Sequence, residues 1–137
     1  MELSTAISQL NWLAIIASAL STFVIGGLWY SPLLFQKGWM KENNFTGEDP
    51  KMLSAPAVFG LSFILSLIMS LNLALFIGDG NIIYGVIAGF LAGFGWVALA
   101  IGILSLFENR SLKYFLINGG YMVVSFTLMG LILGAWK

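Results

Sequence analysis

Amide, hydroxyl and indole groups are scattered through the long apolar stretches of this 137-residue chain. Their side chains donate and accept hydrogen bonds but carry no charge near neutral pH. An amide in hydrocarbon is costly unless it is paired, so we expect these groups to face protein or water. The candidates for binding a ligand or lining a pore are Asn11, Thr22, Trp29, Asn72, Trp96, Asn118, Tyr121 and Ser125.

Helical spacing places several of these groups on shared faces, because residues three, four and seven apart lie on one side of a helix. In the first apolar stretch the face holds Asn11, Ser18, Thr22 and Trp29, and in the fourth it holds Asn118, Tyr121 and Ser125. One interpretation is hydrogen bonding between helices, worth about 0.6 kcal/mol per contact. The other is a polar cavity or path between the first, second and fourth stretches.

The residues best suited to catalysis are missing or lie near the ends of the apolar stretches. The sequence has no cysteine and no histidine, which excludes thiol chemistry and removes the usual general base. Proton-coupled transport needs an ionisable group inside the membrane, and the apolar interiors hold none. We therefore expect no catalytic residue, no metal site and no cofactor, and no enzymatic activity. The six carboxylates are all predicted at or beyond the membrane surface: Glu2, Glu42, Glu48, Asp49, Asp79 and Glu108.

Composition and apolar run length predict an all-α membrane protein. Hydrophobic residues make up 59% of the chain and charged residues 9%, against about a quarter charged in soluble domains. About 20 apolar residues cross a bilayer as a helix, and four stretches qualify, at about 12–34, 56–77, 82–107 and 113–136. Short connections predict one domain of four antiparallel transmembrane helices in a compact bundle. Thr46 and Asp49 resemble a capping box, so a short helix could begin there in the first loop.

Basic residues predict the orientation of these spans. The first and third connections and their borders hold Lys37, Lys41, Lys51, Arg110 and Lys113, whereas the other side holds Lys137. Cytoplasmic loops are enriched in lysine and arginine. Loops 36–55 and 108–112 are therefore expected in the cytoplasm, and both termini outside.

Small residues mark the faces along which helices approach closely. Gly85, Gly89 and Gly93 recur every four residues, and Gly130 and Gly134 repeat that spacing in the fourth span. Glycine lets helix backbones meet in a membrane, so these five residues are predicted to serve helix packing. Such faces exceed what four helices need internally, which suggests a homo-oligomer. Trp96 projects from the small face of the third span, where simple packing and a ligand or pore role both stay open.

The first span and the residues after it resemble a known family. Asn11-Trp12, then the run Gly27-Leu28-Trp29-Tyr30-Ser31-Pro32-Leu33-Leu34-Phe35, then Lys37, Trp39 and Met40 resemble the DUF1761 family. The family often has Gly-Lys-Ala-Trp where this chain has Gln36-Lys37-Gly38-Trp39. The resemblance implies a four-span protein of the bacterial inner (plasma) membrane, and it implies no reaction because the family has no established function.

Two functions from different classes fit this sequence. The first is a non-catalytic module that binds lipid, a small apolar ligand or a partner protein. The alternative is a small oligomeric channel or facilitator lined by the Asn, Ser and Tyr faces. Membrane lipid and further copies of the chain are the expected partners. A formal net charge of zero gives no basic patch for nucleic acid.

Overall fold

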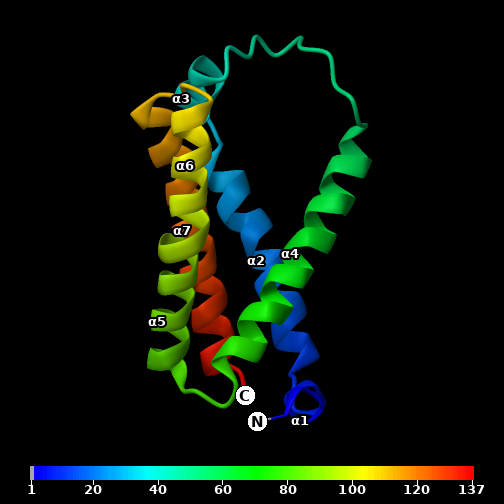
Figure 1. Cartoon of the computed structure of the whole chain (residues 1–137). Helices are drawn as coiled ribbons and strands as arrows, with labels where there is room; N and C mark the ends of the chain where they lie inside the picture. The colour runs from blue at the N-terminus through cyan, green and yellow to red at the C-terminus, as the bar shows by residue number, and fades with distance from the viewer. Residues whose placement is uncertain (1) are drawn as a thin grey trace.

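The computed structural model describes residues 2–137, and in this part of the chain all regular structure is helical. Figure 1 shows the helices connected by turns and one long loop. In chain order they are α1 (Leu3–Ser8), α2 (Trp12–Trp29), α3 (Gln36–Glu42), α4 (Ala55–Ile77), α5 (Ile82–Ala92), the π-helix η1 (Gly93–Ala98), α6 (Leu99–Phe107) and α7 (Leu112–Ala135).

Four helices are long and apolar enough to cross a membrane. They are α2, α4, the continuous rod α5–η1–α6 from Ile82 to Phe107, and α7. This confirms the predicted helical class and the number of apolar spans, and it supports a multi-pass membrane protein.

A polar side chain caps the start of each long helix. The oxygens of Asn11, Ser54, Asn81 and Ser111 accept hydrogen bonds from the backbone N–H three residues on, at 2.9 to 3.3 Å. Such caps satisfy backbone donors that have no partner inside the helix. The caps therefore fix where the spans begin.

The first span ends earlier than the sequence suggested. The apolar run predicted a helix to residue 34, but α2 stops at Trp29 and turns follow. Pro32 lacks a backbone N–H and disfavours helical geometry in the residue before it. Leu33 and Leu34 are apolar but lie in the turn, so the length of the apolar run overestimated the helix.

The loop after the first span holds a short helix, but not where it was predicted. The helix is α3, and no helix begins at Thr46. The Asp49 carboxylate does accept hydrogen bonds from the N–H groups of Thr46 and Gly47, at 2.9 and 3.2 Å. Pro50 follows at once and disfavours helical geometry in Asp49, so these bonds close a turn.

Three of the long helices pack side by side, and the fourth diverges. In Figure 1 the rod α5–η1–α6 runs beside α7, while α4 leans away from both toward its N-terminal end. Residues in contact advance along α2 as they go back along α7, from Asn11 with Trp136 to Trp29 with Ile117.

The best-buried side chains gather where the helices converge. Ile15 and Met129 have no exposed surface, and Leu73 and Ile77 of α4 pack with them. All buried residues of α4 come from its C-terminal part, whereas Val58, Phe59 and Leu61 near its start are exposed. The converging end therefore fixes the fold, and the loop end of α4 is mostly exposed.

Candidate functional site

The five glycines predicted for packing lie between the rod and α7, where backbones meet directly. A Cβ on Gly85 would collide with the Gly130 carbonyl oxygen, and one on Gly89 with that of Phe126. On Gly134 it would lie 2.8 Å from the Asn81 carbonyl oxygen. No rotamer change removes a collision with backbone, so only glycine fits at these positions.

The π-helix η1 follows from this close packing. Gly85, Gly89 and Gly93 are buried at four-residue steps, but the next buried residue of the rod is Ala98, five residues further. A regular helix would direct Val97 toward α7, where there is little room: even a Cβ added to Gly93 would lie 2.8 Å from the Phe126 side chain. One extra residue in the turn directs the small side chain of Ala98 toward α7, while Trp96 faces outward. Such π-turns occur often at functional sites.

A crevice opens between α4 and η1, beside this turn. Its volume is about 370 Å³ and its walls are mostly apolar. The residues that line the crevice are Met69, Asn72, Leu73, Phe76, Ala92, Trp96, Val97 and Phe126.

Two predicted site residues, Asn72 and Trp96, meet at this crevice. The Asn72 amide donates from Nδ2 to the Ile68 carbonyl oxygen at 3.0 Å, and Asn72 remains exposed. The Trp96 side chain is 67% exposed and meets the Phe76 ring edge to face, with centroids 6.0 Å apart. The sequence predicted that the asparagines face protein or water, and Asn72 lies at the opening of the crevice.

Hydroxyl groups join α2, α4 and α7 in what we call the hydroxyl seam: Ser18, Thr22, Ser66, Ser70, Tyr121 and Ser125. Tyr121 donates to the Thr22 carbonyl oxygen at 2.9 Å, and the Thr22 hydroxyl donates to the Ala19 carbonyl oxygen and lies 3.2 Å from that of Ser66. Ser70 donates to the Ile15 carbonyl oxygen at 2.9 Å. The seam thus ties three helices together by hydrogen bonds.

Two hydroxyls in the seam have no partner among the described residues. They belong to Ser18 and Ser125, which are 0% and 1% exposed. The neighbouring α2–α7 pair, Thr22 with Tyr121, places both serines about one turn further toward the converging end. Buried polar atoms are nearly always paired, so these two hydroxyls are exceptional.

Aromatic and amide groups close the loop end of the seam. Trp29 donates from its indole to the Ile117 carbonyl oxygen at 2.9 Å, and the Tyr30 hydroxyl donates to the Asn118 side-chain oxygen at 2.7 Å. The Tyr30 ring meets both Trp39 and Tyr121 edge to face. Tyr30 was not among the predicted site residues, and its hydrogen-bond partner Asn118 lies 88 residues away in the sequence.

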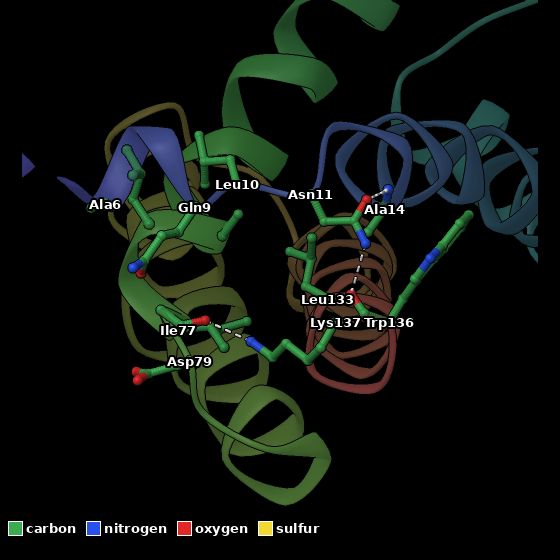
Figure 2. A pocket seen from close by; sticks show the side chains of 13 residues that line it. Ala6, Gln9, Leu10, Asn11, Ala14, Ile77, Asp79, Leu133, Trp136 and Lys137 are labelled. Atoms are coloured by element: carbon green, nitrogen blue, oxygen red, sulfur yellow. Dashed lines mark hydrogen bonds between the residues drawn. The ribbon is translucent and has the colours of Figure 1, made fainter. Parts of the chain in front are cut away.

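At the opposite end, Asn11 joins a small pocket of about 170 Å³ between α1, α2, α4 and α7. Figure 2 shows the Asn11 amide bridging its own helix start and the Trp136 carbonyl oxygen, the latter at 3.1 Å. Lys137 donates to the Gly78 carbonyl oxygen at 2.5 Å, and the Asp79 carboxylate points away from it. Asn11 and Lys137 thus hold the C-terminal end of the chain against the start of α2 and the turn after α4.

The predicted site residues therefore divide between three places. Asn72 and Trp96 line the crevice, while Thr22, Trp29, Asn118, Tyr121 and Ser125 follow the seam and Asn11 lies beyond its far end. Within residues 2–137 no three His, Cys, Asp or Glu side chains converge as metal ligands. The crevice, with the uncharged polar groups of Asn72 and Trp96 on mostly apolar walls, is suited to binding a small molecule.

Comparisons with curated proteins and with solved structures found no match to this chain. A family model described as "Protein of unknown function (DUF1761)" matches residues 13–134. That match covers nearly the whole chain and confirms the resemblance seen in the first span. The chain belongs to the DUF1761 family.

Proposed function

We propose that this protein is a non-catalytic membrane module that takes an apolar molecule with one hydrogen-bonding group from the bilayer into the crevice. The observation that carries the proposal is the exposed Asn72 amide beside Trp96, over apolar walls, on helices that are long and apolar enough to cross a membrane. A polar group in that position is costly unless something pairs with it.

The hydrogen-bonding capacity of Asn72 defines the polar part of the ligand. An amide offers two donor hydrogens and an accepting oxygen, and the Ile68 carbonyl takes one hydrogen. A hydroxyl or carbonyl group on the ligand would pair with what remains. The Trp96 indole offers a second donor at the same opening.

The walls of the crevice define the apolar part of the ligand. A volume of about 370 Å³ falls within the range of small-molecule sites, and the side chains of Met69, Leu73 and Phe126 supply an apolar floor. Because the crevice lies between helices that face the bilayer, a ligand tail can extend into lipid. These properties favour a single-chain amphiphile such as a fatty acid or fatty alcohol.

Trp96 provides the experiment. A brominated fatty acid, titrated into the purified protein in detergent micelles, should quench Trp96 fluorescence to saturation, and Trp96→Phe should remove the saturable part. Ala92→Phe should abolish saturation by filling the crevice. The matched control is Ala100→Phe, at an exposed position of α6 outside the crevice. Quenching that rises linearly, or that survives Ala92→Phe, would reject the proposal.

A second candidate, a path for water or a small polar solute, is favoured by the unpaired hydroxyls of Ser18 and Ser125. Each offers a free donor and acceptor to a solute within the hydroxyl seam. Stopped-flow shrinkage of liposomes should then be faster with the protein, and Ser18→Val with Ser125→Val should remove the gain. Equal rates with and without protein would end this candidate.

We further propose that the four spans alternate in direction, with loops 36–55 and 108–112 in the cytoplasm of a bacterium and both termini outside. Five of the six basic residues near the membrane surfaces support this orientation. The chain has no cysteine, so single-cysteine variants report sidedness directly. In inside-out vesicles, a thiol reagent that cannot pass the membrane should react from the outer face with Lys41→Cys and Arg110→Cys. It should react with Asp79→Cys only from the inner face.

Self-association remains a separate proposal with a narrower basis. The glycines that suggested it lie inside one chain, between the rod and α7. Gly27, Gly60 and Gly95 still have open space where a Cβ would stand, so another copy could approach there. Native mass spectrometry in mild detergent should detect dimers or larger species, and monomers alone would contradict this.

A further inference from the structure

A groove between α6 and α7 lies at the loop end of the molecule, away from the crevice. Its volume is about 560 Å³. Leu99, Ile103, Leu106, Leu112 and Phe115 form apolar walls, and Arg110 lies at the end nearest the loop. The crevice and the groove share no lining residue.

Arg110 is held in a way that keeps most of its donors free. Its guanidinium carbon lies 4.9 Å from the centre of the Tyr114 ring. Its Nε atom lies 3.8 Å from a Glu108 carboxylate oxygen, which is too far for a hydrogen bond. Stacking on an aromatic face leaves the edge of a guanidinium open, and that edge matches a phosphate group.

We propose that this groove binds a phospholipid with an anionic headgroup, whose phosphate meets Arg110 and whose acyl chain lies between α6 and α7. The apolar walls decide between sources of phosphate, because a free phosphate ion would fill only the end beside Arg110. Cationic side chains between helices near the membrane surface are suited to such headgroups. Arg110 also lies two residues before the start of α7, where the helix dipole favours negative charge.

Two carboxylates limit the attraction. Glu108 lies beside Arg110, and Glu42 accepts a hydrogen bond from the Ser111 hydroxyl at the same end of the groove. Both repel an anionic headgroup. The net preference should therefore be moderate, and removing the Glu108 charge should increase it.

The experiment measures competition between lipids in nanodiscs. Spin-labelled phosphatidylglycerol and phosphatidylcholine report the fraction of each lipid held at the protein surface. Wild type should prefer phosphatidylglycerol. Arg110→Gln should reduce that preference by about tenfold, the ratio at the lower end of the range for one charge-assisted hydrogen bond. Glu108→Gln should raise it.

Controls separate the groove from general charge. Lys51→Gln removes the same charge from an exposed loop position and should leave the preference unchanged. Ile103→Trp fills the groove without changing charge and should lower retention of phosphatidylglycerol. Millimolar inorganic phosphate should not compete.

Three results would overturn the proposal: no effect of Arg110→Gln, an equal loss with Lys51→Gln, or full competition by inorganic phosphate. The groove and the crevice can fail independently. Arg110→Gln should leave saturable quenching of Trp96 unchanged, and Ala92→Phe should leave the lipid preference unchanged.

Discussion

The two sides of this molecule hold their helices together by different means. The rod and α7 meet backbone to backbone through glycines, whereas α4 meets α2 through side chains, such as Phe23 with the rings of Phe59 and Phe63. Backbone contact leaves no room for adjustment. Side-chain contact leaves space, and the crevice lies at the border where α4 faces the rod. Close packing on one side thus positions the wall against which the looser side opens.

The largest expected effect comes from breaking the glycine contact. Gly89→Ala places a methyl group against the Phe126 carbonyl oxygen, which cannot move away without shifting α7. We expect a loss of about 3 kcal/mol or more in stability, at the upper end of the range for overpacking. Thermal unfolding in detergent, followed by size-exclusion chromatography, measures it. A melting temperature equal to wild type would contradict the packing.

In the hydroxyl seam, two serine substitutions should change the stability of the protein in opposite directions. Ser70→Ala removes a buried hydrogen bond to the Ile15 carbonyl oxygen and should cost about 1 to 2 kcal/mol. Ser125→Ala removes a buried hydroxyl with no partner and should stabilise the protein by about 1 kcal/mol. Equilibrium unfolding in mixed micelles tests both. If Ser125→Ala destabilises the protein as much as Ser70→Ala does, the Ser125 hydroxyl has a hydrogen-bond partner when the protein is in the membrane.

The α4 side of the molecule should tolerate a methyl group added to a glycine, which the contact between the rod and α7 does not. A Cβ on Gly60 of α4 would meet nothing within 4 Å. Gly60→Ala should therefore stabilise the helix by up to about 1 kcal/mol, the difference in helix propensity. The same unfolding assay serves, with Gly89→Ala as its counterpart. A loss above that size would mean that another surface covers α4 at this point.

The smallest expected effect concerns the loop end of the seam. Tyr30 and Asn118 share a side-chain hydrogen bond, so a double-mutant cycle with Tyr30→Phe and Asn118→Leu should give a coupling of about 0.6 kcal/mol. Additive effects of the two substitutions would show that the bond contributes nothing measurable.

Sequence alone predicted the spans and the residues that share faces, because apolar run length and helical spacing are local properties. The five glycines gather at one interface, and Thr22, Tyr121 and Ser125 lie in one seam. The early end of α2 could have been read from Pro32. The crevice could not be predicted from the sequence, because it depends on how far α4 leans from η1. That lean is set by contacts between residues distant in sequence.

The π-turn between Gly93 and Ala98 makes a single-residue deletion informative. Removing Phe94 would return the rod to regular helical pitch. The residue count from Gly93 to the small groups beyond it would fall from five to four, so Ala98 would stay directed toward α7. Trp96 would still stand two residues before Ala98 and would keep nearly the same direction. Shortening the chain at this point would keep the span, so the deletion would test whether the crevice depends on the extra residue itself or only on the close packing of the rod against α7.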